Sequence, residues 1–177
     1  ENLKSCRNLI DPIIVEHGGR IFHTAGDSVI AEFASPVLCV DAAIEFQNIL
    51  SERNNNVSDE SRIVFRVGIH LDDVIIEGDN VFGGGVNIAA RLESLCEPGC
   101  ILVSRTVQEK VIKRIKHTID SLGNSELKNI EGKFEIFHID PTGESKVKVF
   151  ENKKVEQDSE IKIAKPRIIV LPFRNLN

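Results

Sequence analysis

The sequence contains no methionine, not even at its first position, so we expect its 177 residues to be a piece cut from a longer protein. Long apolar runs are also missing: runs such as residues 168–171 are far too short to cross a bilayer, and no signal peptide opens the chain. We therefore expect no membrane segment in it. An excess of positive charge is lacking too, because 22 basic residues face 27 acidic ones, and the net charge of −5 argues against nucleic acid as a main partner.

Cysteines and histidines are too few and too scattered for a metal-binding pattern. Cys96 and Cys100 form a single C-x3-C with no second pair to complete a tetrahedral zinc site, and none of the five histidines has the H-E-x-x-H spacing. Cys6 and Cys39 fall inside helical patterns, where a buried free thiol behaves as a small hydrophobe. The sequence offers no evidence for a Ser-His-Asp or Cys-His catalytic group. We expect reduced thiols and a cytoplasmic setting.

The residues that are present indicate a folded domain. Hydrophobic residues make up 41% and charged residues 28%, which excludes wholesale disorder, and the length allows one domain plus an appendage. Apolar spacing predicts helices at residues 3–17 (kinked or broken at Pro12), from Ser35-Pro36 to about residue 53, from the glycines at 83–85 to about residue 96, and from a capping box at Thr106-x-x-Glu109. Strands are expected at residues 20–23, 29–33, 63–69, 74–76, 101–103, 117–122 and 133–139, with turns at 26–28 and 123–125.

This order of elements favours an α+β sandwich, with helices packed over one mixed sheet. From about Asp140 to Lys165 the composition turns to Gly, Ser, Lys and Glu with little periodicity, which is typical of a linker. We expect one domain at residues 1–139, a linker at 140–164, and the first strand of a further domain within 165–177.

Four polar residues stand where a ligand is plausible. Asp27 lies at the tip of a turn, a place typical both of a carboxylate that bonds its own backbone and of a metal or phosphate ligand. The glycines at 83–85 let backbone approach an anion, although they match neither a Walker loop nor a dinucleotide fingerprint. Asn87 and Arg91, four residues apart, share one helix face: an amide there can hold a sugar oxygen and a guanidinium can bridge phosphate oxygens, but a plain exposed face has the same pattern. Lys128 is an ordinary surface lysine unless a phosphate lies nearby.

Four segments, in order along the chain, resemble the class III adenylate/guanylate cyclase catalytic domain. They are HGGRIFHTAGDSVIAEF (residues 17–33), FRVGIH (65–70), FGGGVNIAARLE (82–93) and ELKNI (126–130). Each string alone is weak evidence, whereas four in register over residues 3–139 identify the family.

The resemblance implies a ferredoxin-like βαββαβ core and a head-to-tail homodimer with nucleotide sites at the subunit interface. It implies two Mg²⁺ or Mn²⁺ ions held by two aspartates, of which Asp27 matches one. Attack of the ribose 3′-hydroxyl on the α-phosphorus then releases pyrophosphate, a reaction that needs positioning and charge neutralisation. In this resemblance Asn87 matches the ribose-orienting asparagine, Arg91 the arginine that stabilises the transferring phosphoryl group, and Lys128 a phosphate-binding lysine.

The sequence departs from the family pattern in three places. The other metal aspartate of the family lies in a strand before the first helix, where this chain begins, so we expect the fragment itself to be inactive. His23 stands where a base-recognising lysine is usual and Asn80 where its partner aspartate is usual, which leaves the choice between ATP and GTP open; His23 can equally be a strand histidine without a ligand. The sequence predicts a nucleotide cyclase that makes a cyclic monophosphate, with ATP the favoured substrate, for intracellular signalling. The alternative is an inactive cyclase-homology module for dimerisation or nucleotide sensing.

Overall fold

The computed structural model of the chain describes residues 2–25, 28–58, 61–73, 75–77, 80–143 and 166–171. Its described part contains four α-helices, α1 (Asn2–Glu16), α2 (Pro36–Asn55), α3 (Gly84–Leu95) and α4 (Arg105–Val111). Seven described strands form one sheet in the order β1-β2-β9-β3-β6-β8-β7: β1 (Gly19–Ala25), β2 (Ser28–Phe33), β3 (Val67–Asp73), β6 (Ile101–Ser104), β7 (Ile119–Glu126), β8 (Lys133–Ile139) and β9 (Pro166–Leu171). The described strands β4 (Ile75–Glu77) and β5 (Asn80–Phe82) pair as a separate hairpin.

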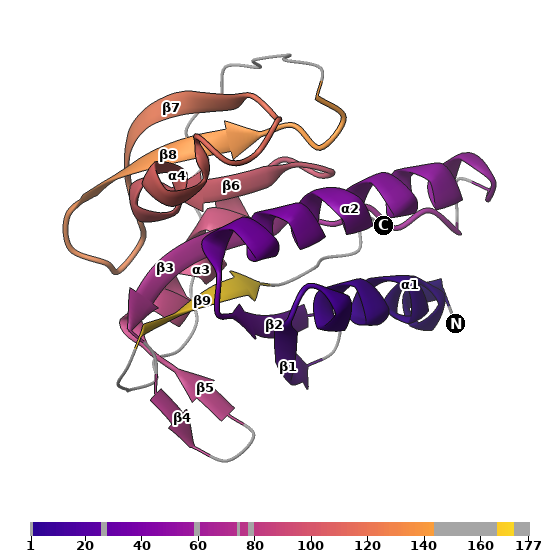
Figure 1. Cartoon of the computed structure of the whole chain (residues 1–177), viewed down its shortest axis with the longest axis horizontal. Helices are drawn as coiled ribbons and strands as arrows, with labels where there is room; N and C mark the ends of the chain where they lie inside the picture. Colours follow the sequence, from indigo (N-terminus) through magenta and orange to yellow (C-terminus); the bar gives the residue numbers. More distant parts are fainter. Residues whose placement is uncertain are drawn as a thin grey trace.

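The sheet is mixed, since β3 and β6 run parallel while the other neighbouring pairs are antiparallel. Helices α1, α2 and α4 cover one face and α3 lies behind the sheet on the other (Figure 1). The main core fills the space between the three helices and the sheet, and its largest fully buried members include Phe33, Phe46 and Phe65. These observations confirm the predicted α+β class with helices packed on a mixed sheet.

Local signals explain where the long helices begin and end. The hydroxyl of Ser35 accepts a hydrogen bond from the N–H of Leu38 at 3.4 Å and Pro36 occupies the first helical position, as the sequence predicts. Helix α1 buries Cys6 and Ile10 on one side and continues through the exposed Pro12, so the expected break does not occur.

Three local predictions are wrong, two of them at places where a contact from elsewhere in the fold intervenes. Strand β3 begins at Val67 rather than 63: the carbonyls of Ile63 and Phe65 accept side-chain hydrogen bonds from α2, and that of Phe65 also accepts the backbone N–H of Gly99. Thr106 is not a cap: α4 begins at Arg105, and the Thr106 hydroxyl bonds Ser104 and the carbonyl of Leu71.

The third correction concerns the turn expected at residues 123–125. Strand β7 continues to Glu126, and Gly123, with φ +80°, sits where the β7–β8 register shifts. A bulge absorbs a glycine of this conformation within a strand. The reversal of the chain therefore comes later, at residues 127–132.

Strand β9 lies in the middle of the sheet. It pairs antiparallel with β2 on one side and β3 on the other, so that Val170 is opposite both Ala31 and Ile69. The predicted strand after residue 165 is therefore present. Its assignment to a further domain, like the boundaries at 139 and 165, stays a prediction, and residues 144–164 of the expected linker lie outside the described residues.

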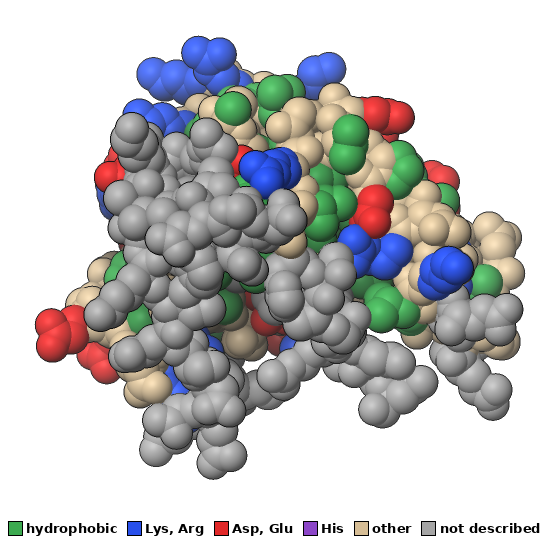
Figure 2. Space-filling view, turned by 90° about the horizontal axis from the view of Figure 1, so that it is seen from below, with side chains coloured by type: hydrophobic (Ala, Val, Ile, Leu, Met, Phe, Trp, Pro, Cys, Tyr) green, Lys and Arg blue, Asp and Glu red, His purple; other side chains and the backbone are tan. Residues whose placement is uncertain are grey.

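Charges of both signs occur on the one face drawn as a space-filling surface (Figure 2). On the face seen in Figure 2, basic, acidic and apolar side chains are interspersed across the part that the structure describes. Val15, Leu38 and Ile112 are the large apolar side chains most exposed among the described residues, and they lie on or next to three different helices. Within those same residues, no helix has both the length and the apolarity needed to cross a membrane.

Candidate functional site

Helix α3 carries Asn87 and Arg91, and a glycine on β3 sets how closely it packs. A Cβ atom on Gly68 would lie 2.3 Å from the carbonyl oxygen of Ala89 and 2.4 Å from the backbone nitrogen of Glu93. No side chain fits in this space, so the helix backbone rests directly on the strand. The position of the polar face of α3 is therefore fixed by the backbone of β3.

Two apolar stripes hold α3 from different sides. Ala89 packs with Phe22 and Ile30 of the β1–β2 hairpin. A second cluster joins the helix to β6, β8 and the loop after β7, and its buried members are Ile88, Leu92, Cys96, Leu102, Leu127 and Ile136. Asn87 and Arg91 lie between these stripes and are half-buried. The i, i+4 spacing predicts this shared face correctly.

The loop between β7 and β8 brings Lys128 to Arg91. Leu127 is buried in the second cluster, and the N–H of Ile130 donates to the carbonyl of Leu127 at 3.1 Å, which closes a tight turn with Asn129 at φ 61°. The Nε atom of Arg91 donates to the backbone carbonyl of Lys128 at 3.2 Å. Two of the candidate residues, far apart in sequence, are thus neighbours in space.

The polar ends of these side chains are available for a ligand. Among the described residues, neither the amide of Asn87, nor the terminal guanidinium nitrogens of Arg91, nor the ammonium of Lys128 has a hydrogen-bond or ion-pair partner. A guanidinium whose Nε is already bonded presents its remaining N–H groups in a fixed plane, an arrangement suited to phosphate oxygens. The geometry therefore provides one amide and one oriented cation on a single face, with a second cation in the adjoining loop.

The similarity of the whole chain to known proteins agrees with this arrangement. A family model described as the adenylate and guanylate cyclase catalytic domain matches residues 2–141. The chain belongs to this family. It is 34% identical over 171 residues, or 97% of its length, to the protein named "Putative adenylate cyclase 3" of Rhizobium meliloti, but it spans only 29% of that relative's length.

Solved structures confirm the fold of the cyclase domain. The adenylate/guanylate cyclase/hydrolase from Silicibacter pomeroyi is 35% identical and superposes with a TM-score of 0.73, covering 78% of this chain and 82% of that one. The guanylate cyclase domain of RhGC from Catenaria anguillulae, solved in complex with GTP, is 20% identical with a TM-score of 0.62, over 78% and 80% of the two chains. The predicted ferredoxin-like core of the nucleotide cyclase type is therefore present.

Three predicted site residues remain: His23 and Asn80, for which the structure describes the backbone position alone, and Asp27. Asp27 lies outside the described residues. His23 lies in β1 opposite Ile30, next to a register shift, and Asn80 lies in β5 opposite Glu77. Strand β5 lies against β1, so the two positions expected to recognise the base belong to neighbouring elements.

The cyclase family generally uses divalent metal ions. Within the part of the chain that the structure describes, no group of three or more His, Cys, Asp or Glu side chains forms a candidate metal site. All four cysteines are free thiols, and burial raises the pKa of Cys39 and Cys96 well above the usual range. A role for Asp27 in holding an ion stays a prediction.

Sequence analysis missed a buried polar chain at the end of β3. The Nδ1 atom of His70 lies 2.8 Å from the hydroxyl of Ser104, and its Nε2 lies 4.0 Å from Oδ2 of Asp72. Burial lowers the pKa of His70, and the Asp72 carboxylate partly opposes this. Ser104 is itself buried, with only 3% of its surface exposed. The signal available in the sequence was the period of two that puts residues 68, 70 and 72 on one strand face.

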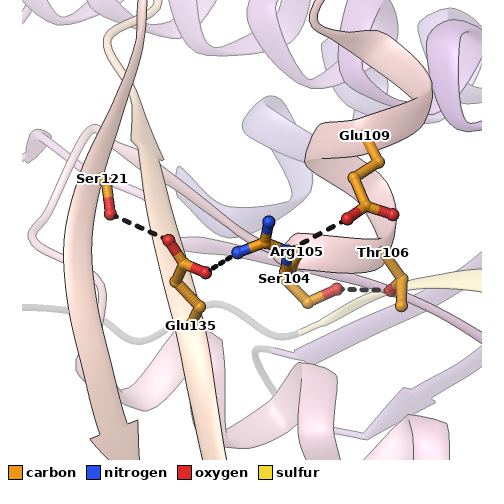
Figure 3. Close-up of polar contacts among 6 residues, drawn as sticks. All are labelled: Ser104, Arg105, Thr106, Glu109, Ser121 and Glu135. Atoms are coloured by element: carbon orange, nitrogen blue, oxygen red, sulfur yellow. Dashed lines mark hydrogen bonds and ion pairs between the residues drawn. The ribbon is translucent and has the colours of Figure 1, made fainter.

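A second polar cluster lies on the surface beside it and joins α4 to the last hairpin. Arg105 pairs with Glu109 on its own helix at 3.0 Å and with Glu135 on β8, and Glu135 also accepts a hydrogen bond from Ser121 (Figure 3). Exposed ion pairs contribute little to stability because water and salt screen them. We assign this cluster no role in catalysis, which makes Arg105 a suitable control for Arg91.

Proposed function

We propose that the chain is the catalytic domain of a nucleotide cyclase. It converts a nucleoside triphosphate, with ATP as the substrate, into a 3′,5′-cyclic monophosphate and pyrophosphate for signalling inside the cell. The observation that carries this proposal is the hydrogen bond from Arg91 to the carbonyl of Lys128 in a domain of the cyclase family. It joins two of the residues that the family resemblance assigns to the phosphates.

The proposed roles follow from the chemistry of the side chains. As the ribose 3′-oxygen attacks the α-phosphorus, negative charge builds up on the phosphoryl oxygens and on the leaving pyrophosphate. The terminal N–H groups of Arg91 stabilise that charge, and the ammonium of Lys128 neutralises the phosphates. The amide of Asn87, one helical turn before Arg91, orients the ribose.

We further propose that Asp27 holds the divalent ions, Mg²⁺ or Mn²⁺, and that His23 and Asn80 contact the base. A bound ion would supply Lewis-acid activation of the attacking hydroxyl and charge neutralisation at the triphosphate. Two copies of the domain associate head to tail, so that Asp27 of one subunit and the α3 face of the other enclose the same nucleotide.

The test uses the full-length protein, because the resemblance places another metal aspartate before residue 3. Purified protein is incubated with ATP or GTP and Mn²⁺, and the products are separated by chromatography and identified by mass spectrometry. The proposal predicts cyclic AMP and pyrophosphate in equal amounts, and about 10²–10³-fold slower formation of both in Arg91→Ala. Tight nucleotide binding without either cyclic product, in a folded dimer, would instead establish the inactive sensing module.

A further inference from the structure

Asp72, at the end of β3, lies against the first turn of α3. A Cβ atom on Gly85 would lie 2.6 Å from the Cβ of Asp72 and 3.2 Å from its Oδ2, and a Cβ on Gly84 would lie 3.9 Å from the same oxygen. The side chain of Asp72 therefore occupies the space that a side chain at position 85 would otherwise fill, whereas a Cβ at position 84 has room. Gly85 allows a group from the neighbouring strand to approach the helix backbone closely.

Helix α3 supplies no polar cap or negative charge of its own at this end. Its N-cap residue is Gly83, no side chain caps it, and its first turn contains no acidic residue. The first N–H groups of a helix have no partner within the helix, and together with the helix dipole they give this end partial positive charge. A carboxylate at this position therefore stabilises the helix electrostatically.

The carboxylate of Asp72 is held in place from the strand side. Its Oδ1 accepts a hydrogen bond from the N–H of Asp73 at 2.8 Å, and its Oδ2 faces Nε2 of His70 at 4.0 Å. His70 is in turn bonded to Ser104, which lies 2.9 Å from the hydroxyl of Thr106. Among the described residues packed around His70, Asp72 is the one whose charge affects the pKa of His70. Ser104 and Thr106 are neutral.

We propose that Asp72 is a positioning residue: it supplies from β3 the negative charge that α3 lacks at its N-terminus, and so fixes the helix that presents Asn87 and Arg91. Its effect on turnover rests on the proposed cyclase function, whereas its effect on the helix does not. Loss of the carboxylate loosens the first turn of α3, and the transition-state contacts made one and two turns later become less well aligned.

Asp72→Asn tests this, because the amide keeps the shape and the hydrogen bond from Asp73 while it removes the charge. Asp73→Asn is the matched control, since Asp73 is exposed and its atoms are not among those nearest to Gly84 or Gly85. Hydrogen exchange of the amides of residues 86–88, which are hydrogen-bonded in the first turns of α3, should quicken about twofold to fivefold in Asp72→Asn, the range expected for a charge at a helix end, and stay unchanged in the control. In the full-length enzyme kcat should fall more than KM changes.

A second variant tests whether faster exchange in Asp72→Asn comes from the lost charge or from a general loosening of the fold. Gly84→Asp places a carboxylate within the first turn itself. It should slow exchange in the Asp72→Asn background, and it should fail to do so in wild type, where it lies beside the existing carboxylate. Equal effects in both backgrounds, or unchanged exchange in Asp72→Asn, would overturn the proposal.

The two proposals fail in different ways. A wild-type enzyme without cyclase activity refutes the proposed function but does not affect the conclusion from hydrogen exchange about Asp72. Normal exchange in Asp72→Asn refutes the role of Asp72 whatever the activity.

Discussion

The Nε atom of Arg91 donates a hydrogen bond to the backbone carbonyl of Lys128, at 3.2 Å, between residues 37 apart in the sequence. Helix α3 and the β7–β8 loop are thereby joined at the polar surface and, through Leu92 and Leu127, in the apolar cluster beneath it. Burying each leucine contributes about 1.5–3 kcal/mol, so packing rather than the single hydrogen bond holds the loop against the helix. The hydrogen bond sets the orientation of the guanidinium.

Replacing Arg91 with alanine should lower the rate of the chemical step. Because the charge that Arg91 meets develops mainly in the transition state, we expect kcat to fall by about 10²–10³ while the nucleotide Kd changes much less. Steady-state kinetics and calorimetric nucleotide binding measure the two effects. Arg105→Ala, which removes an exposed arginine from α4, should leave both unchanged. Equal losses in kcat and binding for Arg91→Ala would contradict a transition-state role.

Two inactive variants should complement each other if the site is shared between subunits. Mixed and re-equilibrated Asp27→Asn and Arg91→Ala proteins form heterodimers with one intact site, so about a quarter of wild-type activity should return at equal concentrations. The assay is cyclic nucleotide production before and after mixing. Asp27→Asn mixed with itself is the control. No recovery, with subunit exchange shown by mass spectrometry, would place both residues in one subunit's site.

Gly68→Ala should destabilise the domain and displace α3. The added methyl group would lie 2.3 Å from the carbonyl oxygen of Ala89, so the helix must move away from the strand, at a cost of about 1–3 kcal/mol. Urea denaturation measures the free energy of unfolding. Gly84→Ala is the matched control, because a Cβ there has room, and it should stabilise by about 0.4–1 kcal/mol. Similar effects at both positions would show that α3 does not rest on the backbone of β3.

Gln47 is buried in α2 and joins it to two backbone segments. Its amide nitrogen donates to the carbonyls of Phe65 and Cys100, both at 3.1 Å. Each carbonyl also accepts a backbone N–H, so neither is left without a hydrogen bond in Gln47→Met. The substitution should therefore lower the free energy of unfolding by about 1–2 kcal/mol, less than the loss expected for two buried carbonyls without any partner. Thermal and urea unfolding test this. Asn56→Ala removes an exposed amide at the end of α2 and should have a smaller effect.

Stability should fall as the pH drops below about 6.5. Burial lowers the pKa of His70 and of His138 from the ordinary value of 6.5, against the opposing effect of nearby aspartates. Between the lowered pKa and 6.5 the unfolded chain therefore binds more protons than the folded one, and stability rises with pH by up to about 1.4 kcal/mol per pH unit for each histidine.

Unfolding free energies at several pH values between 5.5 and 8 measure this slope. Replacing both histidines with glutamine should flatten the curve below pH 6.5 and leave it similar above. An unchanged slope in the double variant would assign the acid sensitivity to other groups.

Most of the secondary structure follows from local patterning. The extended run at residues 133–139 predicts β8 with the bounds that the structure has, and the Ser35-Pro36 cap predicts where α2 begins. The sequence fails where a distant group replaces a local partner. Thr106 satisfies the pattern of a capping box, yet its hydroxyl bonds the neighbouring Ser104 and the carbonyl of Leu71 on β3.

In the candidate site, too, some features follow from local patterning and others depend on tertiary contacts. That Asn87 and Arg91 share a face follows from the helical period alone, since four residues make about one turn. That Lys128 lies beside Arg91 depends on the burial of Leu127 under α3, which no local pattern encodes. The role of Asp72 is likewise invisible along the chain, because its contact with Gly85 arises only once α3 packs against β3. Periodicity and capping describe interactions within a few residues, whereas the alignment of charges on α3 depends on how closely separate backbones approach.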